Sequence, residues 1–444
     1  MNKIIEFFSF QDANVLYVVL GTVLLAAASA IVGSFTFLKK KSLAGDAVAH
    51  AVLPGICLAF MFAGNKNPFA LIVGSFITGW LSLICIDFIT SKTKLKEDTA
   101  IGLVLSVFFG VGILLLTSIQ HSGNAEQSGL EGFIFGKAAA LVGTDIVIFA
   151  TLAIILVTTV LLCFKELTLI AFDVSFAKAI GFPVRWLELL LTTLTVMAVV
   201  VGIQAVGVVL MAAMLITPAA AARFWTDKLK VMVFLAALLG GISAVGGSLV
   251  SYLFVNMPTG AWIVLILSLL AVASFLFAPQ KGIVARSLRQ RRHKKRFLEE
   301  NILKTLYHLG EANKDFYRNY TTTEMQAKRF FDVKTLKNAL KRLRKQGYMV
   351  EITRSTQNGQ NIQNGQNIQQ WRLSTEGFER GRRVTKLHRL WEVYLTEYLQ
   401  IAPDHVHDDA ETMEHIITPE LEQTLEKWLK YPKNDPHNTE IPYQ

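Results

Sequence analysis

The sequence predicts an all-α polytopic membrane protein with a small α+β domain of the winged-helix type at its C-terminal end. Three observations lead to this fold class. The first 280 residues hold only 15 Lys/Arg and 13 Asp/Glu, whereas the remaining 164 residues hold 29 and 21. Long apolar runs recur through the first part at the length that a helix needs to cross a bilayer. Beyond residue 296 these runs stop, and amphipathic helical periodicity followed by an alternating strand pattern replaces them.

About nine transmembrane helices are expected in the first part. Only Gly202, Gln204 and Gly207 separate the sixth run from the seventh, so these two are either helices joined by a sharp turn or one kinked helix. The runs are 15–38, 43–63, 67–90, 99–119, 145–164, 187–204, 205–222, 231–254 and 260–278. We therefore divide the chain into a transmembrane domain at 1–280, a basic linker at 281–296, a winged-helix domain at 297–375 and a helical extension at 376–444.

Basic residues are distributed unevenly between the two sides of these spans. With the N-terminus outside, nearly all of them face one side, and only Lys3, Lys66 and Lys137 lie opposite. The clusters on the richer side are 39–41, 92–96, 165–185 and 223–230. Because the side rich in Lys and Arg is normally cytoplasmic, we expect the N-terminus outside and the C-terminal domain in the cytoplasm.

Two ionisable residues lie within the second apolar run. Asp46 and His50 are four residues apart, so a helix places them on one face. An ionisable side chain at bilayer depth is costly and normally faces a polar pathway or a partner. A carboxylate and a neutral imidazole together suit a divalent transition metal. The spacing alone leaves open metal handling, proton handling, or a buried hydrogen bond that only joins two helices.

Residues 42–55, which include this pair, resemble the signature near the second span of the metal-ion permeases of ABC uptake systems. Two further stretches are similar to the same family. Residues 171–183 resemble the cytoplasmic loop on which such permeases seat their ATPase, and residues 204–223 resemble the helix that returns after this loop. The three stretches occur in the family's order, and the resemblance extends from about residue 15 to residue 280.

This resemblance implies a type II ABC importer-like fold in a bacterial cytoplasmic membrane. It implies that Asp46 and His50 coordinate manganese, zinc or iron that an external binding lipoprotein delivers. Divalent ions take about four to six donor atoms, so water or a second permease subunit, identical or different, must complete the set. No Walker A pattern occurs in the chain, so we expect a separate cytoplasmic ATPase subunit. The chain itself is then not an enzyme and holds no permanent cofactor, since the metal is the transported ion.

The loop at 172–183 is the expected coupling element between this chain and the ATPase. It is short and amphipathic, and it ends in a Gly-Phe-Pro turn that sets its angle. Its pattern alone also fits an ordinary cytoplasmic connection. The residues that we assign to coupling are Phe172, Asp173, Ala177, Gly181 and Pro183.

The order of elements after residue 296 is typical of a winged helix: a helix at 297–309, a helix-turn-helix at 323–346, and a strand pair that starts at 347–352. Residues 357–369 are polar and of low complexity, which indicates a mobile wing tip. The helix at 333–346 carries a basic cluster that either contacts DNA phosphates or forms a solvated face. The neutral charge of the domain beyond residue 297 argues against strong DNA affinity. The candidate contacts are Lys334, Lys337, Lys341 and Arg342.

Residues 382–392 and 405–415 resemble the metal-responsive repressors of the diphtheria-toxin-repressor class. This resemblance implies a site for manganese or ferrous iron formed by His388, Glu411, Glu414 and His415. The class also takes acidic ligands from its first helix, whereas the aligned residues 301–304 contain no carboxylate. The extension therefore either senses metal or has a structural or dimerising role, with a lysine near the site replacing the charge of the cation.

Taken together, these patterns predict the permease subunit of an ABC importer for divalent transition metals. Manganese is favoured over zinc and iron because the attached domain resembles manganese and iron sensors. The alternative function is a membrane-tethered, metal-responsive transcriptional regulator that has kept a permease-like anchor. A neighbouring ATPase gene would favour the permease, whereas target-gene control that survives the loss of transport would favour the regulator.

Overall fold

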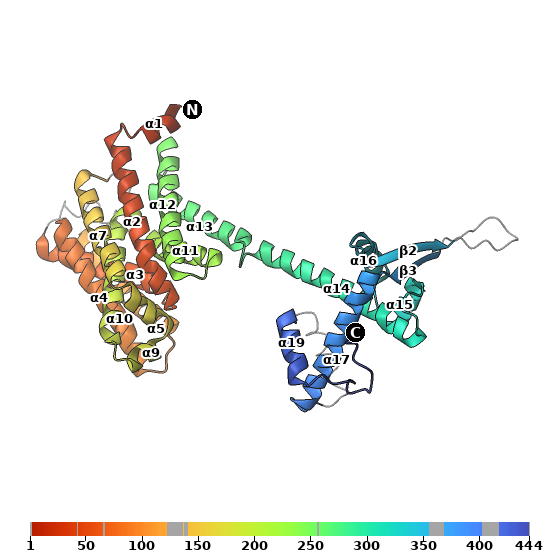
Figure 1. Ribbon diagram of the computed structural model, residues 1–444. Helices are drawn as coiled ribbons and strands as arrows, with labels where there is room; N and C mark the ends of the chain where they lie inside the picture. Colours follow the sequence, from red (N-terminus) through yellow and green to blue (C-terminus); the bar gives the residue numbers. More distant parts are fainter. Residues whose placement is uncertain are drawn as a thin grey trace. The chain divides into compact units, whose positions relative to one another are not determined.

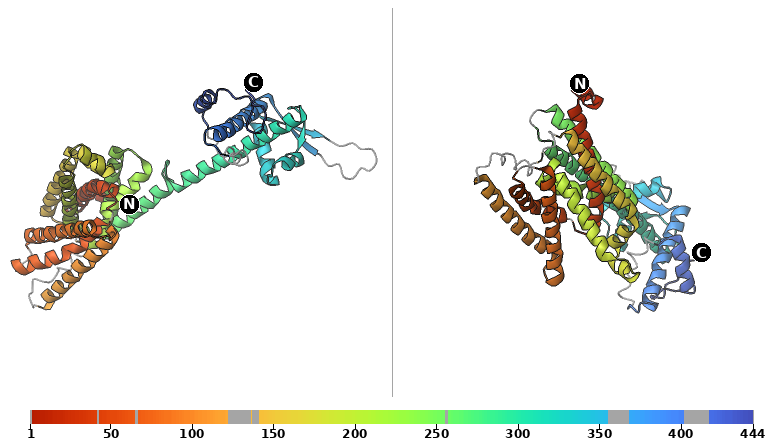
Figure 2. Two further views of the ribbon diagram at one scale, coloured as in Figure 1. Left: turned by 90° about the horizontal axis from the view of Figure 1, so that it is seen from below. Right: turned by 90° about the vertical axis from the view of Figure 1, so that its left-hand side faces the viewer.

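The computed structural model describes residues 2–41, 43–64, 67–121, 136, 141–254, 257–354, 368–401 and 417–443. The chain divides into two compact units, Met1–Arg286 and Ser287–Gln444, which Figures 1 and 2 show from three sides. Each unit has its own hydrophobic core, as expected of separate domains.

The described residues of unit 1 form helices and no strands. Eight of these helices are long and apolar enough to cross a membrane, and a ninth apolar helix, α11 (Val208–Trp225), is shorter. The eight are α2 (Ala13–Leu38), α3 (Ala44–Ala63), α4 (Pro68–Lys92), α5 (Glu97–His121), α7 (Gly143–Leu162), α10 (Val184–Val206), α12 (Leu229–Leu253) and α13 (Thr259–Phe277). Three short helices, α1 (Asn2–Ser9), α8 (Phe164–Phe172) and α9 (Val174–Ala179), complete the unit.

The nine predicted apolar runs correspond to these nine apolar helices. The division between the sixth and seventh runs is confirmed as a break between two helices, because Gly207 ends α10 with a φ of 93° and α11 begins at the next residue. The all-α membrane fold is thus confirmed, with eight helices of full spanning length among the described residues.

The core of unit 1 forms around α2 and α10. In Figures 1 and 2 helix α2 lies inside the unit, where it contacts α7, α10, α11 and α12. Val32 and Phe35 of α2 and Val196 of α10 are fully buried. Helices α3 and α4 approach especially closely, since a Cβ atom at Gly55 would lie 2.2 Å from the Gly74 carbonyl oxygen. Small residues at such crossings allow the dense backbone packing that membrane helices use in place of a hydrophobic driving force.

Unit 2 has the predicted winged-helix order. It contains α14 (Ile283–Asn313), β1 (Tyr320–Thr321), α15 (Thr322–Lys328), α16 (Val333–Lys345), β2 (Met349–Arg354), β3 (Ile368–Leu373), α17 (Thr375–Glu397) and α19 (Pro419–Trp428). The strands form an antiparallel sheet in the order β1-β3-β2, with Glu351 paired to Trp371. Leu306 of α14, Leu340 of α16 and Trp371 of β3 pack together in its core.

Local sequence signals explain where the helices of unit 2 begin. Thr321 and Glu324 form a reciprocal capping box at the start of α15, and the Asp332 carboxylate accepts the Thr335 backbone N–H at the start of α16. Ser374 caps α17 in the same way. These caps fix the helix-turn-helix and the helix that follows the strand pair.

The basic linker predicted at 281–296 is helical over most of its length, because α14 already starts at Ile283 and runs on into unit 2. The expected wing tip at 357–369 lies outside the described residues apart from its last two positions, which belong to β3.

Candidate functional site

Helix α3 brings Asp46 and His50 together as their spacing predicts. The His50 Nε2 atom lies 3.6 Å from the Asp46 Oδ1 atom. The Asp46 side chain is 41% exposed and the His50 side chain is 23% exposed, whereas Ala47, Ala49 and Ala51 around them are fully buried. The pair therefore occupies the one side of this turn that the other described helices leave uncovered.

Two features of α3 set the chemistry of the Asp46 end. Asp46 lies in the first turn, near the positive end of the helix dipole. Leu43, the residue at the N-cap, makes no side-chain capping bond to the free amides of that turn. The carboxyl oxygen atoms of Asp46 are thus the acidic group at the start of α3, on its uncovered side.

The imidazole of His50 is held by an aromatic contact with α5. Its ring meets the Phe109 ring edge to face, with a centroid distance of 5.3 Å and an interplanar angle of 90°. The Nε2 atom faces Asp46, while the buried Nδ1 atom has no hydrogen-bond partner among the described residues. A neutral imidazole in this setting retains a lone pair for a metal or a water molecule.

Pro54 adds a further polar atom to the same helix. It lies inside α3, four residues after His50, and proline has no amide hydrogen to donate. The His50 carbonyl oxygen therefore cannot receive the hydrogen bond that residue 54 of a regular helix would give it. A carbonyl oxygen released in this way can be satisfied by water or by a passing hard cation.

The described residues alone do not complete a metal site. Nowhere in the described ranges do three or more His, Cys, Asp or Glu side chains gather at metal-binding distance. Asp46 and His50 supply one carboxylate and one imidazole, which suits manganese, zinc or ferrous iron as a transported ion. Water or a second subunit on the uncovered side of α3 could add further donors to such a pair.

The predicted coupling loop at 172–183 starts at the last residue of α8 and contains α9 and a tight turn. The Asp173 Oδ1 atom accepts the Phe176 backbone N–H at 2.8 Å and caps α9. Gly181 has a φ of +83° and no atom near the position of a Cβ, so the turn before Pro183 needs the left-handed backbone that glycine adopts freely. Phe172 is 61% exposed and available to a partner.

The burial of each side chain shows which residues of this loop can contact a partner, and this set differs from the one predicted from the sequence. Ala177 is fully buried, so it anchors α9 to the helix bundle and does not form part of the outer surface. Phe176, Ile180 and Phe182 are exposed large apolar side chains that the sequence reading missed. Their spacing from Phe172 was the available signal, because apolar residues at 172, 176 and 180 repeat every four positions, although the structure divides them between the end of α8 and α9 with its C-cap.

In unit 2, three of the four basic candidates on α16 face solvent. Lys334, Lys337 and Lys341 are exposed, and they form no ion pair within the described parts of the chain. Arg342 instead binds Glu299 of α14, with 2.7 Å between its Nε atom and the Glu299 Oε1 atom. Arg342 thus joins two helices of the domain, whereas the three candidate lysines, together with Lys345, remain exposed and without an ion pair among the described residues.

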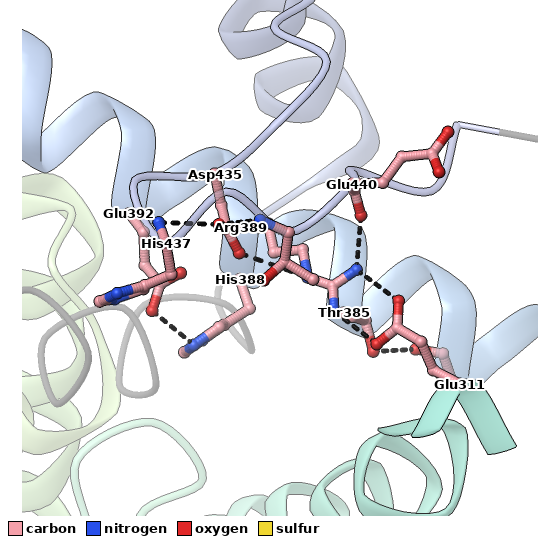
Figure 3. A network of polar contacts seen from close by, with 10 residues as sticks. Glu311, Thr385, His388, Arg389, Glu392, Asp435, His437 and Glu440 are labelled. Carbon is pink, nitrogen blue, oxygen red and sulfur yellow. Dashed lines mark hydrogen bonds and ion pairs between the residues drawn. The ribbon is translucent and has the colours of Figure 1, made fainter. Parts of the chain in front are cut away.

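Of the four residues assigned to a sensor site, only His388 is described. It is 3% exposed on α17, and its Nε2 atom lies 3.0 Å from the Oε1 atom of Glu392, which is 2% exposed. Figure 3 shows the imidazole pointing to this carboxylate. Glu411, Glu414 and His415 lie outside the described residues.

Unit 2 also buries a lysine and a second histidine on α14. Lys304 is 3% exposed, and His308 lies one turn further along the same helix. Burial, together with the charges of Lys304, Arg389 and His388, lowers the pKa of His308 to about 3. Lys304 is thus a buried basic residue in the segment 301–304, in which the sequence comparison with the repressor class finds no carboxylate.

Arg389 connects this region to the end of the chain (Figure 3). Its guanidinium group donates to both carboxylate oxygens of Glu311 on α14, at 3.0 and 2.7 Å, and to the Glu440 carbonyl oxygen at 2.6 Å. Asp435, in the same terminal segment, accepts the backbone N–H groups of His437 and Thr439. The segment after α19 is therefore an ordered part of unit 2, held by a buried charge network.

Comparison with known families identifies the family to which unit 1 is similar. The model described as "ABC 3 transport family" matches residues 11–278, which is more than half of the chain. The chain belongs to the ABC 3 transport family. It is thus a multi-pass membrane permease, and the family expectation drawn from residues 42–55, 171–183 and 204–223 is confirmed. A second model, "Iron dependent repressor, metal binding and dimerisation domain", matches residues 374–443 and confirms the resemblance of the extension.

Relatives of this ABC 3 permease carry names from metal transport. The manganese transport system membrane protein MntC of Bacillus subtilis is 42% identical over 392 residues, which cover 88% of this chain and 86% of that protein. The zinc transport system membrane protein TroC of Treponema pallidum is 44% identical over 283 residues, which cover 64% of this chain and 95% of that protein. Among solved structures, PsaBC from Streptococcus pneumoniae in complex with Fab matches with a TM-score of 0.57 and 33% identity, and covers 65% of this chain and 99% of that one.

Proposed function

We propose that this chain is the membrane subunit of an ABC importer that carries a divalent transition metal, manganese foremost, into the bacterial cytoplasm. The observation that carries the proposal is the Asp46–His50 pair, partly exposed on an otherwise buried turn of α3 in a permease fold. An uncovered carboxylate and imidazole within a spanning helix fit a cation that passes along that face.

The metal preference rests on the donor types and on the relatives. One carboxylate, one imidazole and water suit manganese and ferrous iron, and zinc accepts the same set. The B. subtilis relative named for manganese covers 88% of this chain, whereas the T. pallidum relative named for zinc covers 64%. Manganese is therefore the first cargo to test, with zinc and iron beside it.

Three partners follow from this function. A cytoplasmic ATPase would contact the exposed apolar face of Phe172, Phe176 and Ile180 and stimulate transport through the turn at Gly181. A second permease subunit, identical or different, would cover Asp46 and His50 and add donor atoms. An external binding lipoprotein would deliver the ion on the side of the N-terminus, with unit 2 in the cytoplasm according to the positive-inside rule.

The test is ATP-driven uptake by the purified complex. The chain would be reconstituted in liposomes with its ATPase and binding protein, and uptake of manganese, zinc and ferrous iron would be compared with and without ATP. We expect ATP-dependent accumulation of manganese that exceeds that of the other two ions. Uptake that needs no ATPase, or no uptake of any of the three ions, would contradict the proposal.

For unit 2 we propose regulation of transport by contact, with metal sensing through His388, Glu411, Glu414 and His415 as the competing role. The lack of a carboxylate in residues 301–304, where the repressor class takes acidic ligands, favours the first role. The exposed lysines of α16, which form no ion pair among the described residues, favour a tethered regulator of transcription. Binding of the full chain to duplex DNA at physiological salt, absent in Lys334→Gln/Lys337→Gln/Lys341→Gln, would support that alternative.

A further inference from the structure

The first half of α14 differs from every other basic segment of the chain. The last spanning helix, α13, ends at Phe277, and α14 begins only six residues later at Ile283. The Gly282 backbone N–H donates to the Ala278 carbonyl oxygen at 2.9 Å, which makes this connection a tight turn. Residues 281–296 contain eight basic residues and no acidic residue. A dense positive segment thus starts directly at the end of a membrane span.

Most of these charges have no acidic partner among the residues that the structure describes. Lys281 pairs with Asp227, and Arg296 pairs with Glu300. The other six are exposed and form no ion pair with any described residue; they are Arg286, Arg289, Arg291, Arg292, Lys294 and Lys295. Their charge remains available to a partner outside the chain.

The second half of the same helix has the opposite character. Its acidic residues are bound by arginines of α16 and α17: Glu299 by Arg342, Glu300 by Arg380, and Glu311 by Arg389. The chain beyond residue 296 is neutral overall. The excess charge is therefore confined to the part of α14 that lies nearest the last span in sequence.

The order of side chains along this part matches the layers of a membrane surface. Ile283, Val284 and Leu288 come first and are 47%, 41% and 51% exposed, and most of the unpaired basic residues follow them. Residues 283–296 extend over about 20 Å as a helix. A headgroup layer of about 5–8 Å and a screening length of about 8–10 Å beyond it span nearly the same distance.

We propose that residues 283–296 of α14 bind anionic phospholipid headgroups of the leaflet that α13 reaches, and so hold the start of unit 2 at the membrane surface. The basic side chains point to all sides of the helix, which suits a helix surrounded by headgroups better than one laid into a DNA groove. This inference goes beyond metal import and does not depend on which ion is carried.

The test uses the full chain in nanodiscs of phosphatidylcholine alone and of phosphatidylcholine mixed with phosphatidylglycerol. Backbone amide hydrogen exchange would be measured over 283–296. A basic side chain near an anionic surface contributes about fivefold in binding, so we expect exchange to slow by at least about tenfold in the anionic discs and to recover at high salt. Equal exchange in the two lipids would overturn the proposal.

Two variants with the same loss of charge make the test specific. Arg289→Gln/Arg292→Gln/Lys295→Gln alters exposed side chains without partners, so the fold is retained and the protection should disappear. Lys334→Gln/Lys337→Gln/Lys341→Gln on α16 is the control and should keep it. Loss of protection in the control alone, or equal protection of 283–296 by duplex DNA in neutral discs, would overturn the assignment to lipid.

A second measurement does not depend on helix dynamics. Native mass spectrometry of the purified chain counts the phosphatidylglycerol molecules retained, and we expect the α14 variant to retain several fewer than the wild type or the α16 control. Metal uptake by the α14 variant distinguishes this inference from the proposed function, since lost lipid contact with intact uptake leaves the importer in place.

Discussion

Each unit of this protein contains a histidine and a carboxylate one helical turn apart, and the two pairs lie in opposite surroundings. Asp46 and His50 are 41% and 23% exposed with 3.6 Å between their nearest side-chain atoms, whereas His388 and Glu392 are 3% and 2% exposed and 3.0 Å apart. The first pair leaves donor capacity unused on an uncovered helix face. In the second, a closed hydrogen bond occupies the Nε2 atom of the imidazole.

The difference shows that residue type and spacing do not determine what a His–carboxylate pair does. A buried carboxylate must be compensated by hydrogen bonds or positive charge, and the His388 ring lies 3.0 Å from Glu392. Asp46 needs no such compensation because it remains partly exposed. Of the two pairs, the one in unit 1 is the more accessible to an ion.

The largest expected effect follows from removing the exposed pair. Asp46→Ala and His50→Ala should each lower manganese uptake by at least about a hundredfold, since each removes one of the two side-chain donors that the described residues offer to the proposed site. Accumulation of radioactive manganese in cells is the measurement. Both variants should remain in the membrane at wild-type levels, because neither side chain is buried.

Ser106→Ala on the exposed face of α5 is a matched control and should transport normally. Wild-type accumulation of manganese, zinc and iron in either α3 variant would show that the exposed pair is structural, and the contrast with unit 2 would then disappear.

A second prediction separates the binding of the ion at the exposed pair from the coupling of transport to ATP hydrolysis. Gly181→Val forces a β-branched residue into a left-handed conformation that costs about 1–2 kcal/mol, so the coupling turn should shift. We expect metal-stimulated ATP hydrolysis by the complex to fall several-fold while manganese still binds. Gly181→Asn should restore much of the activity, because asparagine tolerates this backbone region. Unchanged ATP hydrolysis in Gly181→Val would count against a coupling role.

The third prediction tests whether the buried pair belongs to a sensor. Deletion of residues 297–444 should leave a permease that imports manganese but no longer slows when cytoplasmic manganese rises. Uptake would be followed at increasing internal manganese and compared with Glu414→Gln/His415→Ala. Feedback lost only in the deletion means regulation by contact, and feedback lost in both means metal sensing. If both keep it, unit 2 does not regulate transport.

The buried pair should matter for stability and not for import. His388→Ala removes a partner of a buried carboxylate, which should destabilise unit 2 by about 1–3 kcal/mol and leave manganese uptake unchanged. Hydrogen exchange of the β3 amides in the full chain reports this stability. Glu397→Ala, exposed near the end of the same helix, should change it by less than about 0.5 kcal/mol. If His388→Ala lowered manganese uptake as strongly as Asp46→Ala, the buried pair would also take part in import, and the contrast between the two units would fail.

The smallest effect concerns the pH dependence of unit 2. Burial and nearby charges lower the pKa of His308 to about 3, so the unfolded chain takes up a proton near pH 6.5 that the folded domain excludes. The stability of unit 2 should therefore be constant above pH 6.5 and decrease as the pH falls towards 3. In His308→Gln this slope should be shallower between pH 6.5 and 5, where few carboxylates titrate. Identical slopes in the two proteins would contradict the assignment.

Much of the fold follows from residue pattern because it depends on local physics. The lengths of the apolar runs predicted the spanning helices, since a bilayer demands internally bonded backbone over a fixed thickness. Gly207 and the caps at Thr321, Asp332 and Ser374 mark element ends by their own backbone preferences and hydrogen bonds. The i, i+4 spacing likewise placed Asp46 beside His50.

Tertiary structure decided which of these residues can act, because exposure depends on contacts with distant parts of the chain. It buried Ala177 and exposed Phe176 and Ile180 on the coupling loop, although all three share one short segment. It also brought Lys304 and Arg389, which are 85 positions apart, to the surroundings of His308 and His388. The sequence by itself determined that each unit has a histidine and a carboxylate one helical turn apart. Only packing decided that the pair in unit 1 is partly exposed and the pair in unit 2 is buried. The burial of a side chain and the electrostatic potential at it depend on all the residues around it in the folded domain, and no local sequence pattern contains them.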